Sequence, residues 1–208
     1  DLSRRLQSGD DTGARAAFSR ATEISLALTI PASVALMVIP LPLVSVLFER
    51  GALTSDDSAA IAVAVAIYGL GLPAFVLQKT LQPLFYARED TKSPFRYALV
   101  AMTVNAALAF GLAPFIGWIA PAIATTLAGW IMVLCLAIGT RPMGEVARFD
   151  TQLRRRIWRI CLASAGMGGI LWSASASMST FLGMDGWRYL ALFILVTLGI
   201  VSYFALAQ

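Results

Sequence analysis

Long apolar runs separated by short polar connectors dominate the chain. The runs lack the residue-by-residue alternation of membrane strands, and most are close to the roughly 20 residues that a helix needs to cross a bilayer. Because they are apolar all round, they predict helices surrounded by lipid. The predicted spans are residues 21–39, 58–86, 97–115, 120–139, 157–176 and 187–207, with a short apolar piece, residues 43–48, after the first.

Basic residues between the spans predict the orientation of the chain. The chain has 16 Lys and Arg residues, of which Lys79 lies within a span. If the helices alternate, only Arg50 and Arg188 fall on one side of the membrane, and all the others fall on the opposite side. Positive residues are enriched on the cytoplasmic side of membrane proteins. Both ends of the chain are therefore predicted to be cytoplasmic.

The connectors divide the chain into four predicted parts. A basic cytoplasmic segment and four transmembrane helices precede a linker, which is followed by the last two helices. Apolar residues recur in the linker at three-to-four spacing, which is typical of an amphipathic helix in the headgroup layer, bound by anionic lipid. A plain basic loop that only sets the orientation is the alternative. The four parts are residues 1–20, 21–139, 140–156 and 157–208.

Composition excludes a water-soluble domain. Hydrophobic residues make up 58% of the chain and charged residues only 13%, whereas soluble domains carry about 25% charged residues. The chain has no histidine, and Cys135 and Cys161 lie inside apolar runs, which argues against a disulfide framework or a zinc site. Without a nucleophile, base or metal constellation, the sequence predicts no enzyme, no metal site and no nucleic-acid partner.

The second span contains the one charge that lies well inside an apolar run, Lys79. Because an unpaired charge in lipid is costly, such residues usually face a cavity or a partner. Gln82 and Tyr86 follow at helical spacing and form a polar stripe with Lys79, and Gln78 is adjacent. A cavity is favoured, with Lys79, Gln82 and Gln78 as candidate substrate-binding residues. The alternative is that Lys79 snorkels to the cytoplasmic headgroups.

Two prolines, Pro73 and Pro83, lie within the same span. Proline removes a backbone donor and interrupts the helical hydrogen-bond ladder. Helices broken in this way are typical of segments that line a transport cavity. The sequence therefore predicts a broken second helix.

Three ordered motifs resemble the MurJ/MviN family. They are an LFxRGAF-like turn, a GLPAF helix kink and an FYAREDTKTP-like cytoplasmic loop, with Leu53 where phenylalanine is common and Ser93 where threonine is common. The resemblance is close over residues 1–94 and only compositional beyond. The motifs occupy residues 47–54, 71–75 and 85–94.

The resemblance implies a lipid II flippase of the multidrug/oligosaccharidyl-lipid/polysaccharide exporter superfamily, in a bacterial inner membrane. Members have fourteen helices in two lobes around a cationic cavity and work by alternating access. The chain would supply the last six helices as a C-terminal fragment that lacks the N-terminal lobe. Its partners would be that lobe, membrane lipids and lipid II, whose diphosphate Lys79 would contact. The last two helices would form a groove for the isoprenoid tail.

Two further candidate sites come from the polar residues near the third and fourth spans. Arg88, Glu89 and Asp90 lie in the loop before the third span, where an intracellular gate or turn is expected. Asn105 and Thr125 are mid-membrane and form a candidate site for a coupling monovalent cation, the one cofactor considered, although an interhelical hydrogen bond from Asn105 is the favoured alternative.

Three functions remain open from the sequence. A lipid II flippase is favoured by the three motifs. A related exporter of drugs or polyprenyl-linked oligosaccharides would share the fold, whereas a non-transporting membrane scaffold would not need Lys79.

Overall fold

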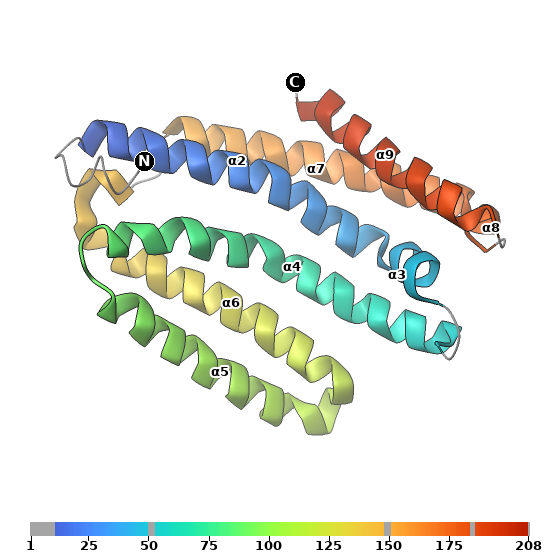
Figure 1. Cartoon of the computed structure of the whole chain (residues 1–208), viewed down its shortest axis with the longest axis horizontal. Helices are drawn as coiled ribbons and strands as arrows, with labels where there is room; N and C mark the ends of the chain where they lie inside the picture. Colours follow the sequence, from blue (N-terminus) through green and yellow to red (C-terminus); the bar gives the residue numbers. More distant parts are fainter. Residues whose placement is uncertain (1–10, 50–52, 148–150, 184–185, 208) are drawn as a thin grey trace. The chain divides into compact units, whose positions relative to one another are not determined.

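The computed structural model describes residues 11–49, 53–147, 151–183 and 186–207, and these residues form helices and turns without any strand. The predicted all-α membrane fold is confirmed, because each of the six predicted spans corresponds to one long helix (Figure 1). By length and composition, the helices supply five continuous membrane-length stretches, since α5, the short 3-10 turn η1 (Gly117–Ile119) and α6 count as one. The long helices are α2 (Asp11–Val38), α4 (Ser55–Tyr86), α5 (Lys92–Ile116), α6 (Ala120–Gly139), α7 (Thr151–Ser177) and α9 (Arg188–Ala207).

Proline starts a short helix directly after the first span. α2 ends at Val38, and Ile39 has non-helical backbone angles (φ −122°, ψ 42°). The next helix, α3 (Pro40–Phe48), begins at Pro40, where a missing N–H costs no helical hydrogen bond. The predicted apolar piece after the first span is thus a separate helix. A second short helix, α8 (Ser179–Leu182), follows α7.

The linker between α6 and α7 differs from its predicted amphipathic helix. Residues Arg141–Ala147 form 3-10 turns (η2) on either side of Gly144, whose φ of 77° and ψ of −152° are not helical. Glycine adopts a positive φ without steric cost, so the helix breaks there. α7 then begins at Thr151, six residues earlier than its predicted span. A single helix through the linker is therefore wrong.

Some predicted features fall outside the described residues. They are the first half of the basic N-terminal segment (residues 1–10), the centre of the first motif (residues 50–52) and the middle of the linker (residues 148–150).

The helix predicted to break at Pro73 is continuous. α4 runs from Ser55 through Pro73 and Pro83 to Tyr86. Pro73 has no N–H to donate to the carbonyl of Gly69. The hydroxyl of Ser33 on α2 donates to that oxygen instead, at 2.6 Å. Because a neighbouring helix satisfies the freed carbonyl, the proline is accommodated without a break.

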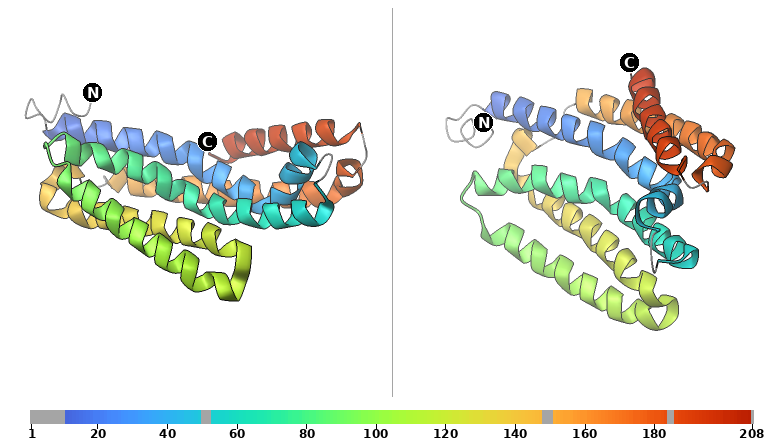
Figure 2. Two further views of the ribbon diagram at one scale, coloured as in Figure 1. Left: turned by 60° about the horizontal axis from the view of Figure 1, so that its bottom comes forward. Right: turned by 45° about the vertical axis from the view of Figure 1, so that its right-hand side comes forward.

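The chain forms two compact units. Unit 1 comprises Asp1–Thr29 and Gly71–Trp158, and unit 2 comprises Ile30–Leu70 and Arg159–Gln208. In unit 1, α5 and α6 are antiparallel neighbours, as both views in Figure 2 show. The core of this unit joins α2, the C-terminal half of α4, and α6, and consists of Phe18, Ala74, Leu81, Leu84, Phe85, Met132, Val133 and Leu136.

The core of unit 2 joins the end of α2 to α7 and α9. Glycines allow this close approach: a Cβ built at Gly168 would lie 2.8 Å from Cγ1 of Val34, and one at Gly199 would lie 3.2 Å from Cδ2 of Leu171. The buried residues of this core are Ile39, Ala163, Met167, Leu171, Leu195 and Tyr203.

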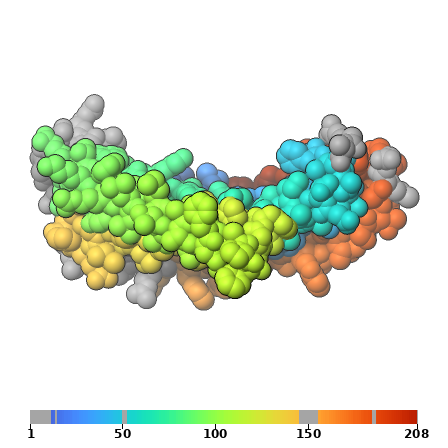
Figure 3. Space-filling model, turned by 90° about the horizontal axis from the view of Figure 1, so that it is seen from below, coloured from blue at the N-terminus to red at the C-terminus, as the bar shows by residue number. Residues whose placement is uncertain are grey.

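Large apolar side chains cover the outer surface of α5, which crosses the face of unit 1 in Figure 3. Phe110 and Phe115 are 81% and 83% exposed, and Phe95 and Met102 are each 64% exposed. Water would be a poor solvent for such a surface, whereas lipid or further apolar helices would cover it at no cost. The surface thus agrees with a membrane-embedded fold.

Candidate functional site

The C-terminal half of α4 has one packing face and one polar face. Ala74, Leu81 and Phe85 on the packing face are buried in the core of unit 1. Successive helical residues are rotated by about 100°, so the positions of Lys79 and Tyr86 lie on nearly the opposite side of the helix. The structure agrees, because Lys79 is exposed and Tyr86 is 51% exposed.

Gln82 lies at the border of the two faces and is half-buried. The predicted stripe of Lys79, Gln82 and Tyr86 is therefore at least partly exposed along one side of α4, within the membrane-length stretch Ser55–Tyr86. It presents an ammonium, an amide and a phenol, all of which can donate hydrogen bonds to an anion.

The second proline of α4 adds a backbone acceptor to this stripe. Pro83 lies four residues after Lys79 and has no N–H, so the carbonyl of Lys79 loses its usual helical donor. In a membrane such a group needs another partner or a wet cavity. The ammonium and the freed carbonyl therefore belong to the same residue.

Gln78, one helical turn before Gln82, already has a hydrogen-bond partner within unit 1. Its Nε2 donates to the carbonyl oxygen of Gly129 on α6, at 2.9 Å. A Cβ built at Gly129 would lie only 3.2 Å from Cε1 of Phe75, so glycine permits the close approach of α4 and α6 at this level. The structure thus uses the Gln78 amide to join two helices, whereas it shows no such interhelical contact for Lys79 or Gln82 among the described residues.

The Arg88–Asp90 loop is a tight turn that ends α4. The Asp90 N–H donates to the carbonyl of Phe85 at 3.1 Å, and Glu89 has a φ of 60°. This is the pattern of a helix C-terminus with a left-handed residue, a position usually taken by glycine. The guanidinium of Arg88 donates to the carbonyl of Met143 at 2.9 Å, which ties the turn to η2 in the linker.

Asp90 also begins the next helix. Its Oδ1 accepts a hydrogen bond from the N–H of Ser93, at 3.0 Å, in the first turn of α5. Hydrogen bonding from Ser93, through its side chain first and its backbone second, holds the pKa of Asp90 below its ordinary value. The carboxylate is thus a structural acceptor for a helix start, and the gate role of the loop stays a prediction.

Asn105 and Thr125 face each other between α5 and α6. The Nδ2 of Asn105 lies 3.4 Å from Oγ1 of Thr125 as a hydrogen-bond donor. This is the interhelical bond that the sequence favoured over a cation site. Both side chains are half-buried in unit 1.

One contact within unit 1 had no sequence signal. The Nη1 of Arg156 on α7 lies 2.8 Å from both carboxylate oxygens of Glu23 on α2. Both residues lie close to the start of a predicted span. The ion pair joins positions 133 residues apart, and no local pattern in the sequence indicates that these two positions meet.

Comparison with known proteins gives one consistent result. Residues 1–192 match the model of the family described as "Lipid II flippase MurJ". A relative from Rhizobium tropici, named a probable lipid II flippase MurJ, is 40% identical over 183 residues, which are 88% of this chain and 34% of the relative. A relative of the same name from Rhizobium meliloti (strain 1021) is 37% identical over 217 residues, which are 100% of this chain and 39% of the relative.

The fold is also similar to a solved structure, "Lipid II flippase MurJ, inward closed conformation". The TM-score is 0.78 at 27% sequence identity, and the match covers 99% of this chain and 40% of the other. The chain thus spans between a third and two fifths of the length of the curated relatives above.

Proposed function

The chain belongs to the lipid II flippase MurJ family, and we propose that it forms part of a transporter that moves lipid II from the cytoplasmic to the periplasmic leaflet of the bacterial inner membrane. The support comes from the match of residues 1–192 to the family and from relatives at 37–40% identity that carry this name. The proposed role is alternating access with no chemical change to the substrate. An enzymatic role would need a nucleophile, base or metal constellation.

The observation that carries this proposal is the position of Lys79. Its side chain is exposed on the face of α4 that does not pack in unit 1, inside a membrane-length stretch. A lysine there is costly unless it meets water or an anion. The diphosphate of lipid II provides an anion for which a compact ammonium is well suited.

The other polar groups of α4 have supporting roles in this proposal. Gln82 and Tyr86 would donate to phosphate or sugar oxygens beside Lys79. Gln78 would act indirectly, because its hydrogen bond to Gly129 holds α4 against α6. The turn at Arg88, Glu89 and Asp90, tied to Met143 by Arg88, would be the cytoplasmic gate. A monovalent cation near Asn105 and Thr125 would couple to these movements.

Depletion of the intact protein tests the substrate. A diphosphate-sugar headgroup cannot cross about 30 Å of hydrocarbon unaided, so lipid II should accumulate in the inner leaflet and cells should lose their shape and lyse. The measurement is the fraction of lipid II cleaved by a headgroup-cutting enzyme added outside spheroplasts, with and without the protein. Changed drug tolerance with unchanged lipid II exposure, in a strain with no second flippase, would identify a drug exporter instead.

The orientation of the chain has its own test. Cysteines at Ser55 and Ser179, introduced after Cys135 and Cys161 have been replaced by alanine, should react with an impermeant thiol reagent added to intact spheroplasts. Both serines are exposed in the structure. A cysteine at Ser93 should react only after permeabilisation, because the loop before α5 is proposed to be cytoplasmic. Labelling of position 93 from outside would reverse the orientation.

A further inference from the structure

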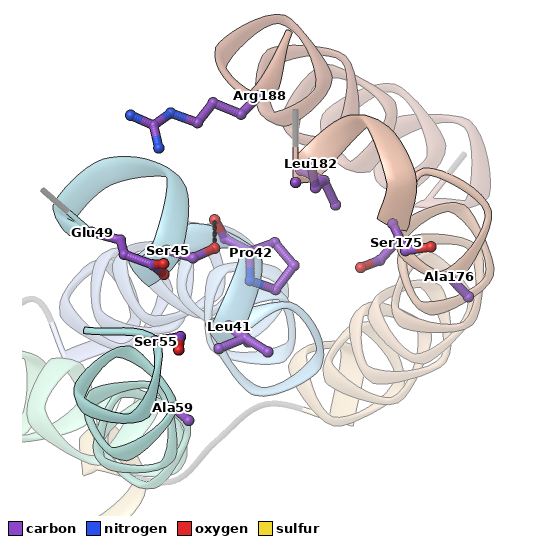
Figure 4. Close-up of a pocket in the computed structure, with 12 residues that line it drawn as sticks. Leu41, Pro42, Ser45, Glu49, Ser55, Ala59, Ser175, Ala176, Leu182 and Arg188 are labelled. Carbon is purple, nitrogen blue, oxygen red and sulfur yellow. Dashed lines mark hydrogen bonds between the residues drawn. The ribbon is translucent and has the colours of Figure 1, made fainter. Parts of the chain in front are cut away.

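Unit 2 contains a cavity of about 540 Å³ whose walls combine apolar residues with serines and two charged side chains, within the range of about 300–1,000 Å³ for small-molecule sites. Its walls come from α3, the first turns of α4, the end of α7, α8 and the start of α9 (Figure 4). The proposed orientation places this end of the helices at the periplasmic surface of the membrane. Nothing in the transport role proposed for Lys79 uses this cavity.

Charges of both signs line the cavity. Glu49 at the end of α3 and Arg188 at the start of α9 are both half-buried, and Figure 4 shows them among the side chains around one hollow. Serine side chains also line the cavity. One of these, Ser45, turns its hydroxyl to the carbonyl of Pro42 at 3.5 Å. The lining therefore offers a carboxylate acceptor, a guanidinium donor and neutral hydroxyls; the serines are Ser45, Ser55, Ser175 and Ser179.

An apolar groove of about 530 Å³ adjoins this cavity, because Leu41 and Ala59 line both. Every lining residue of the groove is apolar. Ala59, Ala62 and Ala66 share one face of α4 and form a floor of small side chains. The opposite wall comes from the region around Pro40, where α2 ends and α3 begins.

We propose that the cavity and the groove together bind one membrane phospholipid with a primary-ammonium headgroup. The occupant follows from the chemistry of the walls. Arg188 suits the phosphate, since guanidinium groups bind phosphate through paired donors. Glu49 suits the ammonium, which donates up to three hydrogen bonds. The groove takes an acyl chain of the same molecule, and its length along α4 points into the membrane.

The two charges also set the selectivity. Phosphatidylcholine has the same phosphate but a quaternary ammonium that donates no hydrogen bond to Glu49. Phosphatidylglycerol has no cation at all and so brings no ammonium to Glu49. Phosphatidylethanolamine alone among the three satisfies both side chains, so the site should rank it first.

Native mass spectrometry of the intact protein in mild detergent tests this inference. Phosphatidylethanolamine, phosphatidylcholine and phosphatidylglycerol with identical acyl chains are added in turn, and the apparent Kd of the tightest site is measured. We expect phosphatidylethanolamine to bind about tenfold more tightly than phosphatidylcholine, since a hydrogen bond to a charged group is at stake. Glu49→Gln should remove this preference, and Arg188→Gln should weaken both lipids.

Two further variants separate the groove from the charges. Ala66→Leu, at a half-buried position on the floor of the groove, fills part of it and should weaken all three lipids. Asp56→Asn serves as the matched control, because Asp56 is exposed at the same end of α4 but lines neither cavity.

Equal affinities for phosphatidylethanolamine and phosphatidylcholine, or an unchanged preference in Glu49→Gln, would overturn the inference. So would displacement of the bound phospholipid by stoichiometric lipid II, which would make the site part of the substrate path. The measurement involves binding only, so its failure would leave the proposed transport function untouched.

Discussion

Replacing Lys79 by glutamate is expected to abolish the ability of the intact protein to support growth of a strain depleted of its lipid II flippase. The reversed charge would repel the diphosphate on the exposed face of α4, beside Gln82. Truncating one partner of a desolvated charge pair typically costs roughly 2–5 kcal/mol, or about thirtyfold or more in rate. Lys79→Ala should fail as well. Growth on depletion medium measures the outcome, with membrane levels of each variant followed by immunoblot.

Two substitutions serve as controls for this result. Lys79→Arg keeps the charge but changes its shape and should be partly tolerated. Lys92→Glu reverses the chain's other lysine, which is exposed at the start of α5, and should support normal growth. If Lys79→Glu grows as well as Lys92→Glu, Lys79 does not contact substrate, and snorkelling to the headgroups becomes the better account.

Gly129→Leu is expected to force α4 and α6 apart. A Cβ at this position would meet Cε1 of Phe75 at 3.2 Å and Cβ of Ala74 at 3.7 Å, and a leucine adds three more carbon atoms at this buried position. The displacement would also break the hydrogen bond from Gln78 to the Gly129 carbonyl. Overpacking of this kind costs about 1–3 kcal/mol. The midpoint of thermal unfolding in detergent, followed by size-exclusion chromatography, should fall clearly.

Gly111→Leu is the matched control in the same unit. Among the described residues, no neighbouring atom lies within 4 Å of a Cβ built at Gly111 on α5. Its midpoint should therefore match that of the unaltered protein. Equal midpoints for the two variants would mean that the close approach of α4 and α6 is not needed for stability.

The comparison of prediction and structure at α4 shows where sequence reasoning works. Helical periodicity alone placed Lys79 and Tyr86 on one face, and the structure leaves that face free because the core takes the other. The same reasoning grouped Gln78 with the site. It could not foresee that Gly129 on α6 would present its carbonyl to this side chain, because that contact spans 51 residues.

The two prolines and the linker show the limits of local rules. Pro73 predicted a broken helix, but Ser33 from α2 satisfies the carbonyl that the proline frees. Apolar spacing predicted a helix through the linker, but Gly144 adopts a positive φ there. The periodic pattern reflects only the polarity of the side chains. The backbone conformation of one residue, Gly144, determined where the helix in the linker breaks.

The sequence by itself determined the six spans, the all-helical class and the polar stripe of Lys79, because a bilayer demands about 20 apolar residues per helix and a helix repeats every 3.6 residues. The tertiary structure alone decided which polar groups form hydrogen bonds or ion pairs between helices. Gln78 with Gly129, Ser33 with Gly69 and Arg156 with Glu23 are contacts between helices far apart in sequence. The tertiary structure also brought Glu49 and Arg188 to the walls of one cavity. Such contacts depend on how neighbouring helices approach one another, and no local pattern of residues encodes that distance.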